Sequence, residues 1–284
     1  MGNIAIVTDS TAGLSADVIA EFDIPIIPLN VHWGTDIFKD GETLAAQTFY
    51  RMLQEREDFP KTSQPSAGEF ITFYEAAARH FNTDNILGIY ISSKLSGTCA
   101  SAVLAQNNMP DLNIEVFDSF SISSGAGMMV LEACQMAQDG ATMEAILTRL
   151  EQMRANTYFY FAVNTLEYLH RGGRIGGAAR FLGTALNLKP LLMVENGRVE
   201  SLEKVRRRRK SLQRVVAVAA DKLAGKHPKD VGIVHTGEDK DLDFMIDLVN
   251  EQLKPQHLRT SILTPVVGTH VGPGAIGVAF HTLD

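Results

Sequence analysis

Residues 85–106 read NILGIYISSKLSGTCASAVLAQ, and this stretch indicates the fold class. The apolar run NILGIYI (85–91) is typical of a buried strand, and TCASAVLAQ (98–106) is typical of a helix. The turn and the start of the helix are rich in hydroxyl side chains, namely Ser92, Ser93, Ser96, Thr98 and Ser101. Since α/β proteins bind ligands where a strand is followed by a helix, the stretch predicts an α/β fold with a ligand at this turn.

The N-terminal half continues the alternation of strands and helices. We expect strands at IAIVT (4–8), PIIPLNVHW (25–33) and IEVFDS (114–119). Ser66 and Glu69 have the spacing of a capping box and predict a helix that runs to about Phe81. This pattern predicts a parallel sheet with helices on its faces.

The C-terminal half has a different pattern. PLLMVENGRVESLEKV (190–205) contains two strand-like runs around Asn196-Gly197, which predicts a β-hairpin. Further strands are expected at YFYFAV (158–163), DVGIVHTG (230–237), RTSILTPVV (259–267) and AIGVAFHT (275–282). A hairpin within an α/β pattern predicts a mixed sheet, so we expect two domains, residues 1–156 and 157–284.

Composition limits the classes of function. The chain has 284 residues, 45% of them hydrophobic, and a formal net charge of -7, which argues against general binding to nucleic acid. The two cysteines, Cys99 and Cys134, fall in expected helices, which favours a reducing compartment. The sequence shows no signal peptide and no apolar run of membrane-spanning length, so we expect a cytoplasmic protein.

The hydroxyl-rich turn admits two chemical interpretations. A serine nucleophile needs a nearby base, but the turn contains no His, Asp or Glu, and the chain has no G-x-S-x-G motif. Alternatively, the N-terminus of the helix and its hydroxyls bind an anion, which Gly97 would allow close to the backbone. One or two of the hydroxyls are also expected to cap the helix.

Three other stretches have possible binding roles. PKTSQPS (60–66) and the glycine-rich loop GTHVGPG (268–274) offer hydroxyls and His270 as hydrogen-bond donors. The turn RGGR (171–174) carries Arg171 and Arg174, which can grip phosphate or form a docking face. GPGAIG (272–277) is discounted as a dinucleotide motif because it contains a proline and no strong helix follows. We expect no metal site, because no metal-binding motif occurs.

Six motifs in order resemble the DegV family. They are TDST (8–11), KTSQPS (61–66), SSKLSGT (92–98), RGGRI (171–175), NLKPLL (187–192) and GTHVGPGAIG (268–277). The resemblance implies two α/β domains that bind a long-chain fatty acid, such as palmitate or oleate, between them. Some members are the fatty-acid-binding subunits of bacterial fatty acid kinase. There a kinase subunit phosphorylates the bound carboxylate with ATP, and the acyl phosphate enters phospholipid synthesis.

The resemblance also implies roles for particular residues. Thr62, Ser93 and His270 would hold the carboxylate, and Arg171 and Arg174 would face the kinase. The neighbours of the head group would be Ser63, Ser92, Ser96, Gly97 and Thr269. On this hypothesis the chain has no catalytic residue and no cofactor other than the bound acid. Lys94 and His170 depart from the residues common in the family, which affects chain preference and partner affinity.

Two rival functions stay open. A hydrolase or acyltransferase that uses Ser93 requires a base within about 3 Å of that hydroxyl. A kinase-type subunit that binds a small hydroxylated substrate, by analogy with dihydroxyacetone kinases, requires a short polar pocket. A long apolar tunnel favours the fatty acid, and its walls are expected to include helix residues that otherwise pack in the core, namely Met128, Met129, Leu131, Phe181 and Leu182.

Overall fold

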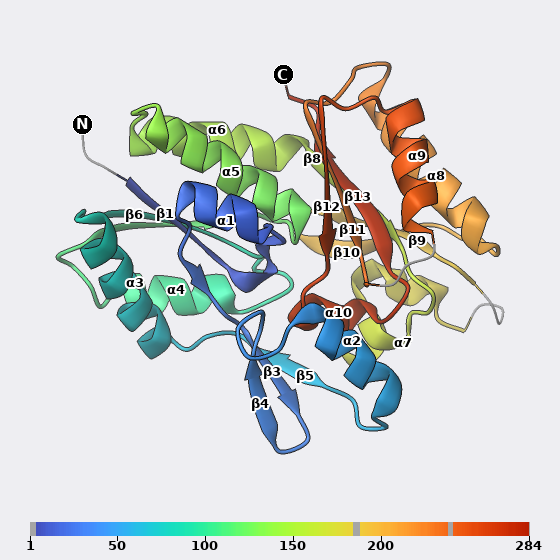
Figure 1. Ribbon diagram of the computed structural model, residues 1–284, viewed down its shortest axis with the longest axis horizontal. Helices are drawn as coiled ribbons and strands as arrows, with labels where there is room; N and C mark the ends of the chain where they lie inside the picture. Colours follow the sequence, from blue (N-terminus) through green and yellow to red (C-terminus); the bar gives the residue numbers. More distant parts are fainter. Residues whose placement is uncertain (1–3, 184–187, 238–240, 284) are drawn as a thin grey trace.

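The computed structural model describes residues 4–183, 188–237 and 241–283, and it contains three β-sheets. Figure 1 shows an N-terminal lobe and a C-terminal lobe, with a small antiparallel sheet beneath the N-terminal lobe. No helix in these described ranges is both long enough and apolar enough to cross a membrane.

The N-terminal lobe contains the expected parallel sheet, whose strand order is β2-β1-β6-β7. Side chains alternate between its faces, so Ala5 and Val7 pack in the cluster with α3 and α4, while Ile4 and Ile6 pack in the cluster with α5. The elements are β1 (Ile4–Asp9), η1 (Ser10–Ala12), α1 (Ala16–Phe22), β2 (Ile26–Ile27), α3 (Ala67–Phe81), β6 (Asn85–Tyr90), α4 (Thr98–Gln106), β7 (Asn113–Asp118), α5 (Ser124–Gln138) and α6 (Met143–Asn156).

One predicted strand is wrong as a single element. PIIPLNVHW (25–33) divides at Pro28, which has no N–H for a ladder. Only Ile26–Ile27 joins the parallel sheet, and the chain then forms the small antiparallel sheet, order β4-β3-β5. Trp33 of this sheet is fully buried with Phe49 of α2. The elements are β3 (Asn30–Trp33), β4 (Asp36–Lys39), α2 (Ala46–Glu55) and β5 (Lys61–Ser63).

The C-terminal lobe contains the expected mixed sheet, order β10-β9-β8-β13-β11-β12. β13 is antiparallel to both β8 and β11, and β12 is parallel to β11. The hairpin at Asn196-Gly197 is confirmed, and both turn residues have positive φ, 48° and 77°. The elements are β8 (Thr157–Ala162), α7 (Glu167–Arg171), η2 (Gly176–Phe181), β9 (Leu191–Glu195), β10 (Arg198–Glu203), α8 (Arg208–Leu223), β11 (Asp230–His235), α9 (Leu242–Gln252), β12 (His257–Ile262), α10 (Pro265–Val271) and β13 (Ile276–His281).

The glycine-rich stretch GTHVGPG is only partly a loop. Its first four residues belong to α10, which starts with Pro265 at a position where a helix does not need the missing N–H. Only Gly272 to Gly274 form the turn into β13, and Gly272 and Gly274 have positive φ. His270 therefore projects from a helix and not from a connecting loop.

Helix α5 connects the two lobes. Its apolar residues join one continuous core with Ile6 and Ile89 of the parallel sheet and with Phe159 and Val234 of the mixed sheet. α6 ends at Asn156 and β8 begins at Thr157, which is where the sequence predicts the domain boundary. The division into domains 1–156 and 157–284 stays a prediction, because this shared core spans it.

Candidate functional site

A cavity lies between the two lobes, and most of its lining is apolar. The mixed sheet contributes Phe159, Phe161, Val194, Val199 and Val234, and the N-terminal lobe contributes Leu29, Ile91, Leu95 and Ile122. The space among the lining side chains, including its opening, is about 800 Å³. This lining suits a hydrocarbon more than a small polar substrate.

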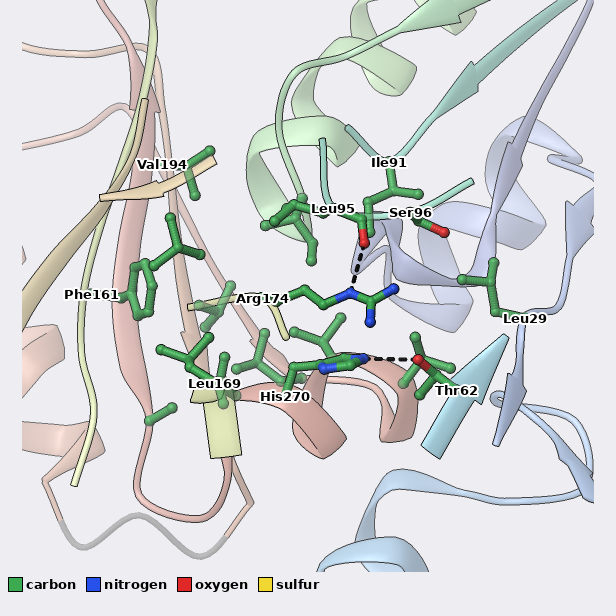
Figure 2. A pocket seen from close by; sticks show the side chains of 18 of the residues that line it. Leu29, Thr62, Ile91, Leu95, Ser96, Phe161, Leu169, Arg174, Val194 and His270 are labelled. Atoms are coloured by element: carbon green, nitrogen blue, oxygen red, sulfur yellow. Dashed lines mark hydrogen bonds between the residues drawn. The ribbon is translucent and has the colours of Figure 1, made fainter. Parts of the chain in front are cut away.

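Polar side chains gather at one end of the cavity. They are Thr62, Ser63, Gln64, Ser96, Arg174 and His270. Thr62 reaches the cavity from β5 and His270 from α10, and 2.8 Å separates Thr62 Oγ1 from His270 Nε2. Figure 2 shows this pair on one side of the Arg174 guanidinium and Ser96 on the other side. Segments from both lobes and from the small sheet thus converge on one polar region.

His270 is neutral at physiological pH. Burial of the ring, together with the smaller effect of the nearby positive charge of Arg174, lowers its pKa to about 4. Nδ1 is buried and has no hydrogen-bond partner among the described residues, while Nε2 faces Thr62. Gly172 allows this packing, because a Cβ there would lie 2.1 Å from Nδ1. The ring therefore offers one hydrogen-bonding nitrogen to the polar end of the cavity.

Arg174 carries a positive charge into this cavity, and no carboxylate of the described residues pairs with it. Its Nε donates to the Leu95 carbonyl at 3.0 Å, and Nη1 donates to the Gly172 carbonyl at 2.7 Å. None of the ion pairs found among the described residues includes Arg174. Figure 2 shows its guanidinium directed toward the space between Ser96 and Thr62. Because a charge near apolar surface is costly when unpaired, this geometry favours an anionic ligand.

The structure places Ser93 outside the cavity, contrary to expectation. Ser93 is exposed, and its backbone N–H donates to Asp118 Oδ1 at 3.1 Å. The preceding Ser92 is fully buried and donates from Oγ to the Gly197 carbonyl at 2.7 Å, which fixes the turn against the β9–β10 hairpin. With the turn held in this way, Ser96 and not Ser93 directs its hydroxyl-bearing side chain to the cavity lining.

Other predicted neighbours of the head group also have structural contacts. Thr269 is buried and donates from Oγ1 to the Pro265 carbonyl within α10. Ser63 does line the cavity, with its Oγ 2.8 Å from His32 Nε2. Gly97 is the N-cap residue of α4, and its missing side chain leaves room for Gln64, whose Nε2 would lie 2.8 Å from a Cβ.

The two arginines of RGGR do not share a face. Arg171 is exposed, its Nη2 lies 2.7 Å from Glu167 Oε1, and its guanidinium lies over the Phe59 ring. Arg174 instead turns into the cavity, because Gly173 takes a positive φ of 70° and reverses the chain after α7. The prediction of a docking face with both arginines did not include this reversal, although the glycines of the turn permit it.

The helix residues suggested as tunnel walls lie elsewhere. Met129 is fully buried in the core and Phe181 is buried, whereas Leu182 is exposed. Met128 and Leu131 line separate hollows beside α1 and β12. The cavity walls come instead from the mixed sheet, from helix α10 with Val266, Val267 and Val271, and from connecting segments such as those of Leu95 and Ile122.

The geometry offers little support for a serine nucleophile. Ser96 Oγ lies 2.8 Å from Thr98 Oγ1, and in the described part of the chain neither Ser93 nor Ser96 has a hydroxyl bonded to a histidine or a carboxylate. A nucleophilic serine requires such a base within hydrogen-bond reach. The arrangement is suited to holding an anion at the end of an apolar cavity.

Comparison with known proteins identifies a family over almost the whole chain. The family model described as "Uncharacterised protein, DegV family" matches residues 3–283. A DegV domain-containing protein of Streptomyces coelicolor is 36% identical over 277 residues, which cover 97% of each chain. Among solved structures, a DegV family protein from Thermus thermophilus, described by its fatty acid binding, has a TM-score of 0.92 at 34% identity, with 100% of each chain covered. DegV from Bacillus subtilis, described as a fatty acid binding protein, has a TM-score of 0.89 at 30% identity, with 99% of each chain covered.

The pKa of His270 tests whether its ring is buried beside Arg174 at the polar end of the cavity. In ligand-free protein, we expect imidazole NMR signals to show His270 neutral down to about pH 5, because its pKa is lowered to about 4. In Arg174→Met the pKa should rise, since one positive neighbour is removed, while Arg171→Met should leave it unchanged. A wild-type pKa at the ordinary value, or equal effects of the two variants, would contradict this geometry.

A signal from His270 itself is needed, because His270 and Asp40 change the free energy of unfolding in opposite directions as pH falls. His270 has a folded-state pKa below its ordinary value, so its contribution to stability is lost as pH falls from about 6.5 toward 4. Burial raises the pKa of Asp40 to about 6, so its contribution increases as pH falls from about 6 toward 4. Unfolding curves would record only the net effect of these two groups and of others such as Asp9, whose pKa is also raised by burial.

Proposed function

Because this chain belongs to the DegV family, we propose that it binds a long-chain fatty acid in the cavity between its lobes. The observation that carries the proposal is the guanidinium of Arg174, which has no acidic partner among the described residues and stands at the polar end of an apolar cavity. A fatty acid supplies the missing anion and the hydrocarbon in one molecule.

The binding energy would come mainly from the acyl chain. A chain of about fifteen methylenes gains roughly 12 kcal/mol of gross transfer free energy at ~0.8 kcal/mol per methylene. Part of this gain is offset by ordering the chain and the protein. The carboxylate then needs only to fix the orientation of the ligand, which agrees with the small number of polar side chains in the lining.

The head group would be held by donors from both lobes. Arg174 supplies the charge, and Ser96 and the hydrogen-bonded pair of Thr62 and His270 supply neutral donors around it. Ser96 replaces Ser93 in this proposal, because Ser93 is exposed and does not line the cavity. No step of bond cleavage is assigned to the chain, so it acts as a binding protein.

We further propose that a separate cytoplasmic kinase subunit phosphorylates the bound carboxylate, and that the acyl phosphate serves phospholipid synthesis. The motif resemblance supports this step, and the exposed Arg171, close in the chain to the cavity residue Arg174, offers a docking cation. Arg171→Ala should lower acyl phosphate formation with the host's kinase subunit while fatty acid affinity stays unchanged. Equal losses of acyl phosphate formation and of fatty acid affinity would show that Arg171 does not belong to the docking surface.

The purified protein should contain a fatty acid. An empty apolar cavity is costly to hydrate, so cellular acids should occupy it during expression. Denaturing extraction followed by mass spectrometry should release a long-chain acid in near-stoichiometric amount. Lipid-free preparations that also fail to bind added palmitate or oleate would contradict the proposed function.

Substitutions at the polar end should affect acids more than alcohols. Hydrogen bonds to a charged partner contribute about 1.5–3 kcal/mol, so Arg174→Met should weaken palmitate binding roughly ten- to hundredfold. Ser96→Ala should have a smaller effect in the same direction. 1-Hexadecanol, which lacks the charge, should lose much less affinity in both variants.

Ser93→Ala is the matched control for Ser96→Ala, since both remove one hydroxyl from the same turn. Titration of palmitate and 1-hexadecanol into wild type and variants measures the effects, with thermal unfolding as a check on folding. Equal losses for acid and alcohol, or a larger loss in Ser93→Ala than in Ser96→Ala, would refute this assignment of the head-group donors.

A further inference from the structure

The outer edge of strand β12 has unpaired backbone groups. β12 (His257–Ile262) is the last strand of the mixed sheet and pairs only with β11 among the described strands. The His257 and Leu263 amides donate to β11 or its flanks, at the Lys229 and His235 carbonyls. Because successive residues of a strand point to opposite edges, the N–H and C=O groups of Leu258, Thr260 and Ile262 point away from β11. Within the described ranges, none of these groups has a hydrogen bond.

A groove runs along this edge for the whole length of the strand. One hollow contains His257 and Arg259, a second contains Arg259 to Ser261, and a third contains Thr260 to Ile262 and Thr264. Adjacent hollows share residues, so together they follow one edge. Six residues of strand correspond to about 20 Å. The groove is therefore long enough for an extended peptide of about six residues.

The opposite wall of the groove comes from the N-terminal lobe. The central hollow is lined by Leu14, which precedes α1, and by Val18 of α1. Met128 and Leu131 of α5 line it as well. Figure 1 shows the edge of β12 directed toward α1 and α5, between the two lobes. A single strand can enter such a recess more readily than the sheet edge of a second folded copy. Edge strands left open in this way are sites of strand addition.

The charge of the groove changes sign along its length. At the His257 end, Lys229 and Arg259 line the hollow, and Asp230 neutralises one of these charges by pairing with Arg259. At the Thr264 end the lining includes the exposed Glu42 and the buried Asp40. A bound segment is therefore favoured with an acidic side chain at the first end and a basic side chain at the second end.

We propose that the edge of β12 is a docking site for an extended peptide segment of a partner protein, which adds a strand to the mixed sheet. Backbone hydrogen bonds to Leu258, Thr260 and Ile262 provide the register. Alternate side chains of the segment are apolar, because one face of an added strand lies against Met128, Leu131 and Val18. This site is separate from the fatty acid cavity, since Arg259, Thr260 and Ser261 line the groove and do not line that cavity.

Selection from a displayed library of random eight-residue peptides, with the full chain as bait, tests the proposal. We expect enriched sequences to alternate apolar residues and to carry Asp or Glu near one end. Thr260→Pro removes the central outward N–H without removing a bond to β11, and proline is tolerated at sheet edges. The selected peptides, synthesised with a fluorescent label, should bind Thr260→Pro about tenfold more weakly than Thr260→Val, which keeps the N–H.

Hydrogen exchange on the wild-type protein tests the same contact without a substitution. The amides of Leu258, Thr260 and Ile262 should exchange at least about tenfold more slowly with a selected peptide bound, while Arg259 and Ser261 are already protected by β11. The proposal is overturned if selection yields no binder, if Thr260→Pro binds as well as Thr260→Val, or if the three amides stay unprotected. It is also overturned if light scattering shows a dimer that Thr260→Pro abolishes, because a second copy would then occupy the edge.

Discussion

The positive charge of Arg174 inside the interlobe cavity is the constraint on which the other features of the site depend. Two backbone carbonyls, Leu95 and Gly172, hold the guanidinium in place and leave it without an acidic neighbour among the described residues. The same charge contributes to the lowered pKa of His270 and so keeps that ring neutral. A neutral imidazole and a hydroxyl can donate hydrogen bonds to a carboxylate and do not pair with Arg174 themselves. An acidic side chain at this end would pair with Arg174 in place of the ligand.

The hydrogen bonds around the cavity also connect the two lobes. Arg174 bonds to Leu95, Thr62 lies against His270, and Ser92 bonds to Gly197 across the interface. Farther out, Tyr50 donates to the Leu263 carbonyl at 3.0 Å, and the Val266 amide donates to Asp40 Oδ1 at 3.1 Å. The second of these bonds holds the first turn of α10, the helix that carries His270. These contacts together fix the two lobes relative to each other around the cavity.

The sequence predicted the fold where the patterns were local. Alternating strands and helices indicated the parallel sheet, and the Asn196-Gly197 turn indicated the hairpin, since both depend on neighbouring residues. Pro28 was a visible signal that PIIPLNVHW would divide, but the separate sheet formed by β3 depends on pairing with the distant β5. Thr62, Ser63, Ser96 and His270 were identified as candidates and do line the cavity. The sequence could not show that Arg174 lines the cavity and Ser93 does not, because the direction of a side chain in a turn is set by tertiary contacts such as Ser92 to Gly197.

Helix α5 has a consequence for how the chain acquires its structure. It belongs to the first 156 residues, yet it covers the mixed sheet as well as the parallel sheet, and Gly232 of β11 leaves room for its Ser124 and Met128 side chains. Synthesised alone, the C-terminal half would expose Phe159, Phe161 and Ala279 to water, and the N-terminal half would expose the other side of α5. Each half also has a core cluster of its own, which includes Tyr74 and Ile86 in the first half and Val216 and Ile233 in the second. The cluster around α5 is the exception, because it is complete only when the last strand, β13, has joined the mixed sheet.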